Sequence, residues 1–233
     1  MNSDFINTLL LTGRLAFWTT AILLLIGFPV AYLLAYRRFP LKAVVEALIS
    51  MPLVLPPTVL GFYMLVAYSP QNGIGKFMSD HFNTRLAFSF EGVLIASVIF
   101  SLPFMIQPLQ NGLSSIPKSY REASYTLGKS EFTTFIRVLI PNMIPSIITA
   151  VAMTFAHCIG EFGVVIMVGG NMPGETRVAS IAIYDEVQAM NYHAANQYSL
   201  VLFIISLAIL TLVYGIKKER TPSPLRGIRK ENP

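Results

Sequence analysis

Five long stretches of this sequence contain no Asp, Glu, Lys or Arg. They are residues 15–36, 47–68, 92–109, 138–160 and 197–216. At a rise of about 1.5 Å per residue, each stretch is long enough as a helix to cross roughly 30 Å of hydrocarbon. A soluble domain of 233 residues, with 54% apolar and 12% charged side chains, has too little polar surface to cover five such helices. The sequence therefore predicts an all-α integral membrane protein with about five transmembrane helices, in one domain over residues 1–216.

The first stretch is expected to remain in the protein as a span. No basic region precedes it, and no small-residue cleavage pattern follows before Arg37. Ahead of it, Phe5, Ile6, Leu9 and Leu10 form a helical stripe. These residues either lie along the outer interface or extend the first span.

The distribution of Lys and Arg predicts the orientation of the chain, because cytoplasmic loops are enriched in both. If the carboxyl end is inside, 13 of the 17 basic residues fall on the cytoplasmic side. The other four are Arg14, Lys76, Arg85 and Arg177. We therefore expect the amino end outside, and the carboxyl end, with a polar tail over residues 217–233, in the cytoplasm. The loop over residues 111–141 is then cytoplasmic, and the basic loops are expected to contact anionic lipid.

The second stretch contains Pro52, Pro56 and Pro57. They are expected to bend or break its helix, because proline lacks an amide proton and clashes with the preceding turn. A broken helix is tolerated in a membrane only where protein or water satisfies its free carbonyls. This span is therefore expected to face other helices or a pore.

The outer segments are expected to be short. Residues 69–91 are predicted to form a loop, and residues 169–177 a turn-rich hairpin. In residues 178–190, Val178, Ile181, Tyr184 or Asp185, and Gln188 fall at helical spacing, but the segment is too short to span the membrane. They predict a short re-entrant or interfacial helix at the outer mouth.

The cytoplasmic loop carries signals for two short helices. Ser119 and Glu122 have the spacing of a capping box and predict a helix start. Gly128 is expected to end this helix in a left-handed turn. A second helix is expected to end at Ile140, because a residue before a proline, here Pro141, avoids helical geometry. The two helices would form an elbow that projects from the membrane.

The loop also resembles a known motif. Glu122-Ala123-Ser124 is followed by three residues, Gly128, nine residues and Val138-Leu139-Ile140-Pro141. The pattern is similar to the EAA loop of binding-protein-dependent ABC importers, which reads Glu-Ala-Ala, three residues, Gly, nine residues, Ile, any residue, Leu-Pro. Ser124, Val138 and Ile140 depart from this pattern but leave the helix, the turn and the proline intact.

Three further segments resemble the permease subunit of molybdate ABC transporters, and the resemblance covers nearly the whole chain up to about residue 216. They are residues 52–61 (PLVLPPTVLG), 160–163 (GEFG) and 173–177 (PGETR). The first two are similar in sulfate permeases, whereas the third favours molybdate. The resemblance does not separate tungstate from molybdate.

The resemblance implies a type I ABC importer permease fold in the inner membrane. It implies a homodimer of this chain, two cytoplasmic ATPase subunits and an external oxyanion-binding protein. ATP and Mg²⁺ would bind the ATPase, so no cofactor is expected in this chain. The elbow would be the coupling helix that lies in a groove of the ATPase. The implied ATPase-coupling residues are Glu122, Ala123, Ser124, Leu127, Gly128, Ile140 and Pro141.

Polar residues within the spans are candidates for gating. A carboxylate near mid-membrane costs roughly 2.5–3.5 kcal/mol, so Glu161 is expected to have an ionic or hydrogen-bonded partner, with Arg177 as the candidate. Because a carboxylate repels an oxyanion, Glu161 is expected to serve structure or gating. His157 is expected to be a neutral, hydrogen-bonded core residue. The gating or pore candidates are Pro56, Pro57, Glu161, Gly163 and Arg177.

The sequence argues against several other classes. Gly128-Lys129-Ser130 resembles the end of a phosphate-binding loop, but Ala123 stands where the earlier glycine is required, so no ATP hydrolysis is expected here. Cys158 is the single cysteine, and no metal site, catalytic constellation or nucleic-acid surface is predicted. Two alternatives stay open: a sulfate or thiosulfate ABC permease, and a secondary transporter or channel, which would usually place more ionisable residues in the membrane than Glu161.

Overall fold

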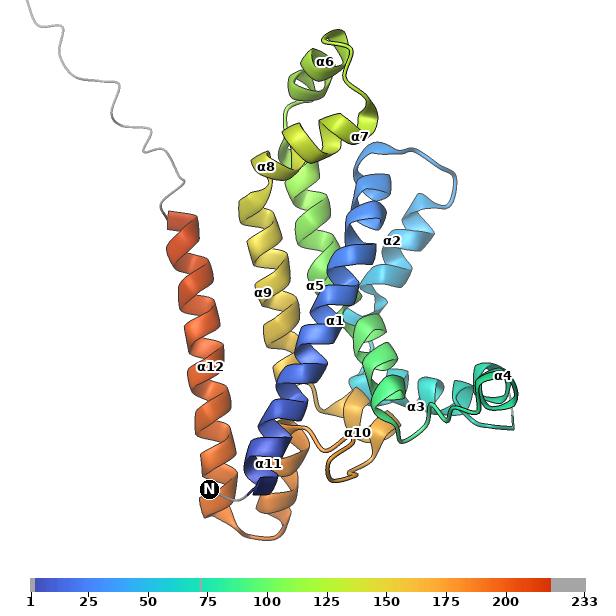
Figure 1. Ribbon diagram of the computed structural model, residues 1–233, viewed down its shortest axis with the longest axis vertical. Helices are drawn as coiled ribbons and strands as arrows, with labels where there is room; N and C mark the ends of the chain where they lie inside the picture. The colour runs from blue at the N-terminus through green and yellow to red at the C-terminus, as the bar shows by residue number, and fades with distance from the viewer. Residues whose placement is uncertain (1–2, 72, 219–233) are drawn as a thin grey trace, which may run out of the picture.

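The computed structural model describes residues 3–71 and 73–218, which fold into helices joined by turns, with no strand among them (Figure 1). Three helices are each long and apolar enough to cross a membrane: α1 (Ser3–Tyr36), α5 (Phe90–Ser115) and α12 (Tyr192–Lys218). Counting each of two bent helix pairs as one span raises the number of candidate spans to 5, the predicted number. From residue 219 onward, the predicted tail lies outside the described residues.

Helix α1 is continuous through the residues for which two interpretations were open, so the structure has the extended first span. It packs against α5 and α9 (Ile144–Gly160). Near its amino end, Thr12 Oγ1 accepts a hydrogen bond from the amide of Ala179 at 2.8 Å and donates one to the carbonyl of Thr8 at 2.7 Å. A polar side chain of the first helix is thereby bonded to a residue 167 positions later in the chain.

The second span is broken at its prolines, as predicted. It consists of α2 (Lys42–Ser50), the 3₁₀ turn η1 (Met51–Leu53) and α3 (Pro57–Ala67), with a bend of 109° between its two parts. Pro56 is extended (φ −54°, ψ 134°), and Pro57 is the first residue of α3. At that position a missing amide removes no intrahelical hydrogen bond. The Pro-Pro pair therefore sets the position of the break.

Besides α3, the half of the described bundle farther from the predicted elbow contains α4 (Gly73–Phe82), α10 (Gly163–Gly169) and α11 (Ala179–Gln188), which are also short. The predicted outer helix is α11. The segment expected to be a loop contains α4, with left-handed backbone at Gly73 (φ 54°) and, just after the helix, at Asn83 (φ 49°). A further difference is α10, which follows the end of α9 and packs against α3 and α5.

The predicted elbow lies at the opposite end of the bundle, at the top of Figure 1. We define the elbow as residues 118–142. It contains α6 (Lys118–Thr126), α7 (Glu131–Thr134), the π-helical turn η2 (Phe135–Leu139) and α8 (Ile140–Asn142). A bend of 76° separates its last part from α9.

The predicted capping box does not form. Pro117 occupies the N-cap position of α6 with an extended backbone (φ −55°, ψ 138°), and no side chain caps the helix. The helix therefore starts at Lys118, which places Ser119 inside the first turn. The ring of Pro117 fixes the backbone angle that a capping side chain would otherwise stabilise.

The predicted helix end at Ile140 is also wrong, because the helix continues through Pro141 to Asn142. In η2 the amide of Ile140 bonds to the carbonyl of Phe135, five residues earlier. This wider turn makes room for the proline ring, which would clash with a regular α-helical turn. The side chain of Asn142 donates a hydrogen bond to the carbonyl of Val138 at 2.7 Å.

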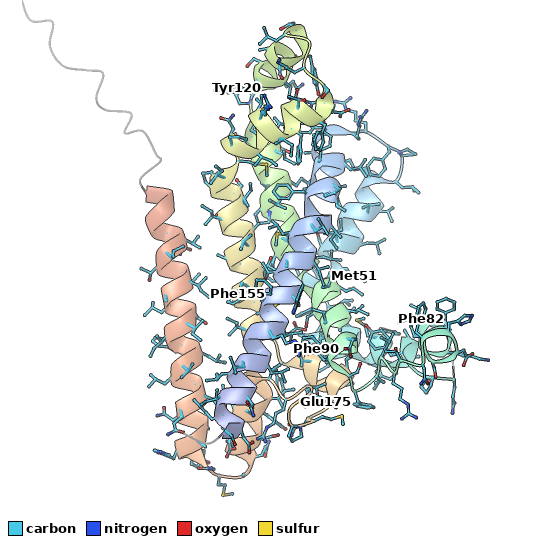
Figure 2. The ribbon with its side chains drawn as sticks, in the orientation of Figure 1. Met51, Phe82, Phe90, Tyr120, Phe155 and Glu175 are labelled. Carbon is cyan, nitrogen blue, oxygen red and sulfur yellow. The ribbon has the colours of Figure 1, made fainter. Side chains whose placement is uncertain are left out.

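The core lies between α1, α5 and α9 at the elbow end, and between α3, α5 and α10 at the other end. The first cluster includes Leu23, Met105, Leu109 and Leu139, and the second includes Leu60, Val93, Val164 and Val168. Tyr120 on α6 lies toward the elbow end of the molecule, and Glu175, in the turn before α11, lies in the opposite half (Figure 2). The amino end of α1 lies far from the elbow, and α12 runs back toward the elbow end (Figure 1).

Candidate functional site

The end of α6 is fixed by a left-handed glycine, as predicted. Gly128 has φ 71°. Its amide donates to the carbonyl of Tyr125 at 2.9 Å, and the amide of Lys129 donates to the carbonyl of Ser124 at 3.1 Å. These two bonds form a Schellman motif, which satisfies the last carbonyls of the helix. The chain can therefore reverse sharply between α6 and α7.

Inside the elbow, hydroxyl groups connect α6 to α7. Ser124 Oγ and Thr134 Oγ1 share a hydrogen bond of 2.8 Å, and both side chains are buried. Thr134 Oγ1 also donates to the carbonyl of Ser130 at 2.9 Å, and Ser130 Oγ caps α7 by accepting from the amide of Thr133 at 3.2 Å. Ser124 thus belongs to the interior of the elbow, and the two helices are held as one unit.

Three of the predicted coupling residues, Glu122, Ala123 and Leu127, lie on the outer surface of α6 and at its C-cap. Glu122 and Ala123 are exposed, and Leu127 is 74% exposed, which is unusual for a leucine outside a membrane or an interface. A cavity of about 560 Å³ lies beside them, lined by Ala123 and Leu127 from α6 and by Val138 from η2. Ile140 and Pro141 do not line this cavity; they lie in α8, at the base of the elbow.

A polar clasp that the sequence does not predict connects the elbow to the end of α1. Glu131 at the start of α7 accepts hydrogen bonds from Tyr32 Oη at 2.6 Å and from the Arg37 guanidinium at 3.1 and 3.3 Å. The hydrogen bond from Tyr32, followed by the charge of Arg37, holds the pKa of Glu131 below its ordinary value of 4.5. In the unfolded chain Glu131 has its ordinary pKa of 4.5, and in the folded chain its pKa is lower. The clasp therefore contributes its full stability at pH values above 4.5, and this contribution is lost as the pH falls through the pKa of the folded state.

A second contact between the same elements involves stacking. The guanidinium carbon of Arg121 on α6 lies 4.0 Å from the ring centre of Tyr36, whose hydroxyl donates to the carbonyl of Leu113 at 2.7 Å. The elbow is thereby connected to α1 and α5 through side chains as well as through the backbone. The one sequence feature that could have predicted these contacts is the pair Tyr32 and Tyr36, which lie one helical turn apart and just before basic residues.

The structure brings three of the five gating candidates together. Pro57, Glu161 and Gly163 line one cavity of about 590 Å³ at the bend of the second span. A Cβ atom on Gly163 would lie 2.7 Å from Cβ of Pro57, so α10 and α3 approach closely there. Pro56 is the N-cap of α3 and adjoins the same bend. Arg177 does not line this cavity.

Glu161 does not pair with Arg177, which corrects the sequence expectation. Its side chain is buried, and neither carboxylate oxygen has a hydrogen-bond partner among the described residues. His157 was also expected to be hydrogen-bonded. Its ring instead stacks at 3.9 Å on Phe104 and lies 5.0 Å from Phe100, and its Nε2 has no partner among the described residues.

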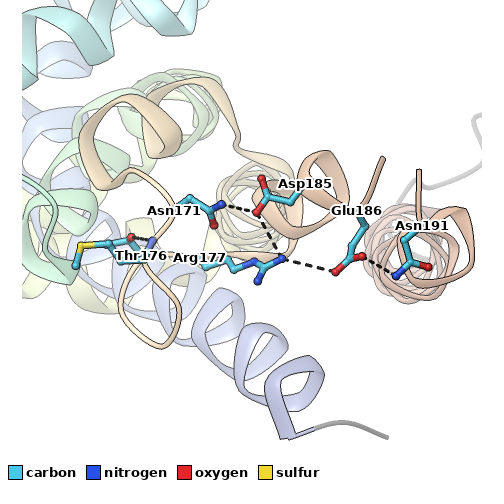
Figure 3. A network of polar contacts seen from close by, with 7 residues as sticks. Asn171, Thr176, Arg177, Asp185, Glu186 and Asn191 are labelled. Atoms are coloured by element: carbon cyan, nitrogen blue, oxygen red, sulfur yellow. Dashed lines mark hydrogen bonds and ion pairs between the residues drawn. The ribbon is translucent and has the colours of Figure 1, made fainter. Parts of the chain in front are cut away.

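Arg177 is held by two acids of α11 (Figure 3). Its guanidinium lies 3.4 Å from Asp185 and 3.7 Å from Glu186. Asn171 donates to Asp185, and Asn191 donates to Glu186 at 2.8 Å. The positive charge of Arg177 is therefore neutralised by α11, so this network fixes the outer turn and presents no free cation.

These features define a class of protein: a multi-helix membrane subunit with a rigid elbow projecting at one end and broken helices at the other. The chain belongs to the family described as binding-protein-dependent transport system inner membrane component, which matches residues 24–218. It is thus a permease subunit of an ABC importer.

Among curated proteins, the chain is similar to the molybdenum transport system permease protein ModB of Azotobacter vinelandii, with 42% identity over 89% of this chain and 92% of that protein. It is also similar to a probable sulfate transport system permease protein cysT of Nephroselmis olivacea, with 33% identity over 82% of this chain and 67% of that protein. Both similarities lie within the one family.

Solved structures support the fold. The superposition on a chain of an inward-facing MetNI methionine ABC transporter covers 95% of this chain and 100% of that chain, with a TM-score of 0.69 and 19% identity. A second similar structure is a bacterial alginate ABC transporter in complex with a periplasmic protein bound to an alginate pentasaccharide. The superposition covers 96% of this chain and 81% of that chain, with a TM-score of 0.77 and 16% identity. At these identities the similarity concerns the fold alone.

Proposed function

We propose that this chain is the membrane subunit of an ATP-driven importer of molybdate or tungstate. Two copies form a homodimer around a conduction path, and two ATPase subunits bind on the cytoplasmic side. An external binding protein delivers the oxyanion, and ATP and Mg²⁺ bind the ATPase. The amino end lies outside the inner membrane and the carboxyl end lies in the cytoplasm.

The observation that carries this proposal is the elbow. A helix that transmits force must be exposed toward its partner and fixed toward its own protein. On α6, Glu122, Ala123 and Leu127 are exposed, whereas Gly128 and the Ser124–Thr134 hydrogen bond fix the helix from behind. We assign the exposed residues to contact with the ATPase, and Ile140 and Pro141 to the base that joins the elbow to the spans.

The broken second span supplies the movable part. Closure of the ATPase dimer would draw the two elbows together and open the outer mouth, which requires spans that can bend. The Pro56–Pro57 break is such a hinge, and Gly163 and Glu161 adjoin it. We assign these four residues to gating. Arg177 would maintain the outer turn, because its charge is already paired.

The cargo is inferred from two observations. Identity to the molybdenum permease is 42%, against 33% for the sulfate permease, and the segment at 173–177 favours molybdate. The external protein would provide most of the selectivity, so a strong anion site in the membrane is not required. Sulfate or thiosulfate is the second candidate cargo, because several sulfate permeases are similar over most of this chain.

The test is uptake by the reconstituted complex. The chain is coexpressed with its ATPase and binding protein and placed in vesicles containing ATP. We expect ATP-dependent uptake of labelled molybdate that unlabelled tungstate inhibits and unlabelled sulfate does not. Preferential sulfate uptake would favour the second candidate. Uptake that continues without the ATPase and follows a proton or sodium gradient would refute the importer mechanism in favour of a secondary transporter.

A further inference from the structure

A cavity of about 520 Å³ lies where the end of α1, the end of α5 and the start of α6 meet. Five of its lining residues are basic: Arg37, Arg38, Lys42, Lys118 and Arg121. Among the described residues, Glu122 is the one acid that lines it. The cavity therefore gathers positive charge from two segments that are distant in the sequence, residues 37–42 and residues 118–121.

Much of this charge is not neutralised by the protein. Arg37 pairs with Glu131 at 3.1 Å, and Lys42 lies 3.9 Å from Glu46. Within residues 3–71 and 73–218, Arg38 and Lys118 form no ion pair. Arg121 stacks on a tyrosine ring and lies near Glu131, which already pairs with Arg37. Arg38, Lys118 and Arg121 thus face one carboxylate that lines the cavity, Glu122, and Arg121 shares Glu131 with Arg37.

The uncapped start of α6 lies beside the same cavity. The helix α6 begins beside the cavity, because Ile116 and Lys118, on either side of the N-cap residue Pro117, both line it. No side chain caps this helix, so its first amides carry partial positive charge without a side-chain acceptor. An anion with several oxygens would satisfy these donors.

The position of the cavity indicates the source of such an anion. The cavity lies where two membrane spans end, which is the depth of lipid headgroups in the proposed orientation. The helix α2, which contributes Lys42, exposes Val44 (53%) and Leu48 (57%) one turn apart. These side chains provide an apolar surface for acyl chains next to a positively charged site.

We infer that this cavity binds a phosphate-type oxyanion, carried by the headgroup of an anionic phospholipid in the inner leaflet. The headgroup would contact Arg38, Lys118 and Arg121 and the first amides of α6. It would connect α1, α5 and α6 and so restrict the movement of the elbow relative to the spans. Binding itself does not depend on the proposed transport function, whereas this effect on coupling rests on it.

The test measures lipid binding to the purified complex in mild detergent, without nucleotide or cargo. Phosphatidylglycerol is titrated, and bound lipid is counted by native mass spectrometry. The test variant carries Arg38→Gln and Lys118→Gln. The matched control carries Lys76→Gln and Arg85→Gln, which remove two exposed cations near the other end of the molecule. A charge-retaining variant, Arg38→Lys with Lys118→Arg, tests for misfolding.

We expect the test variant to bind phosphatidylglycerol about thirtyfold more weakly, because each cation near a lipid surface contributes about 1 kcal/mol. The control and the charge-retaining variant should bind as the unmodified complex does. Equal binding by test and control variants would overturn the site. If inorganic phosphate or molybdate binds with the same dependence on Arg38 and Lys118 while phosphatidylglycerol does not, the lipid assignment is overturned in favour of a free oxyanion. Since no transport is measured, failure here is distinct from failure of the importer proposal.

Discussion

Two glycines show how a single missing side chain determines local structure in this protein. Around Gly128 there is open space, but its left-handed backbone (φ 71°) strains any residue with a Cβ atom. For Gly163 no positive φ is found, and instead Cβ of Pro57 would lie 2.7 Å from an added Cβ. The first glycine is required by the turn of the elbow, and the second by the close approach of α10 to α3.

Gly128→Val should weaken the elbow and lower uptake. A β-branched residue in the left-handed region costs about 1–2 kcal/mol, which favours loss of the Schellman turn. ATPase stimulation and uptake by the reconstituted complex measure the effect, while the amount of chain in the membrane should not change. Gly128→Asn is the control, because asparagine tolerates this backbone better and should retain most activity. Normal uptake by the valine variant would contradict a role for the turn.

Gly163→Ala should destabilise the chain by about 1–3 kcal/mol, the usual cost of overpacking, because α10 or α3 must move. The control is Gly160→Ala, where nothing lies within 4 Å of the added Cβ. Cys158 is the single cysteine and is 2% exposed, so a thiol-reactive fluorescent dye reports thermal unfolding of the purified chain. Equal unfolding temperatures for the two variants would contradict the close approach.

At the scale of elements, the elbow and the first span behave as joined parts. The clasp of Tyr32, Arg37 and Glu131 and the stacking of Arg121 on Tyr36 connect α7 and α6 to the end of α1. Any displacement of the elbow is thus expected to reach α1 directly as well as through α5 and α9. The first span would then take part in the conformational change.

Reversing one charge of the clasp should impair coupling, and reversing both should restore it. Glu131→Arg places a third guanidinium beside Arg37 and Arg121, so we expect uptake to fall severalfold. Exposed ion pairs contribute at most about 1 kcal/mol, so the unfolding temperature should change little. The double variant, Arg37→Glu with Glu131→Arg, should recover uptake. If the double variant is no better than the single one, the ion pair does not serve coupling.

The elements that depend on local chemistry were predictable from the sequence. The five spans follow from length without charge, the break in the second span from Pro56 and Pro57, and the end of α6 from Gly128. The errors had two causes: local backbone geometry at Pro117 and Pro141, and the distant contacts of Arg177. A π-helical turn admits Pro141 into a helix, and α11 supplies acids that compete for Arg177. The spacing of residues along the sequence reveals neither.

At the scale of the whole molecule, the two ends of the described chain lie apart. The helix α1 starts far from the elbow, and α12 runs toward the elbow end (Figure 1). With 13 of the 17 basic residues on the elbow side or in the carboxyl-terminal tail, the elbow side is the expected cytoplasmic side. The arrangement of helices places the two ends of the described chain on opposite sides, and the distribution of charge favours the elbow side as the inner one.

Labelling should detect the two ends on opposite sides of the membrane. In intact cells, a membrane-impermeant reagent should label a tag at the amino end and should label a tag at the carboxyl end only after permeabilisation. Function is checked by uptake with each tag in place. Both tags reacting in intact cells would mean that the number of crossings is wrong, with α11 as the first segment to reconsider.

The purified complex should contain two copies of this chain. The helix α12 packs against α9 and α11. Only 6% of its most apolar stretch is buried, so much of its surface is available to lipid or to a second copy. Native mass spectrometry of the complex measures the copy number. A measured mass that corresponds to a single copy of this chain with two ATPase subunits would refute the homodimer.

The hydrogen bond between Thr12 and Ala179 has a consequence for biosynthesis. The first helix enters the bilayer while the residue that bonds to its hydroxyl is still to be translated, since that residue lies 167 positions later. Until then Thr12 relies on its bond to the carbonyl of Thr8 within the same helix. A nascent chain stopped before Ala179 would therefore hold a partly assembled bundle, and such intermediates are where insertion factors and quality-control proteases are expected to act.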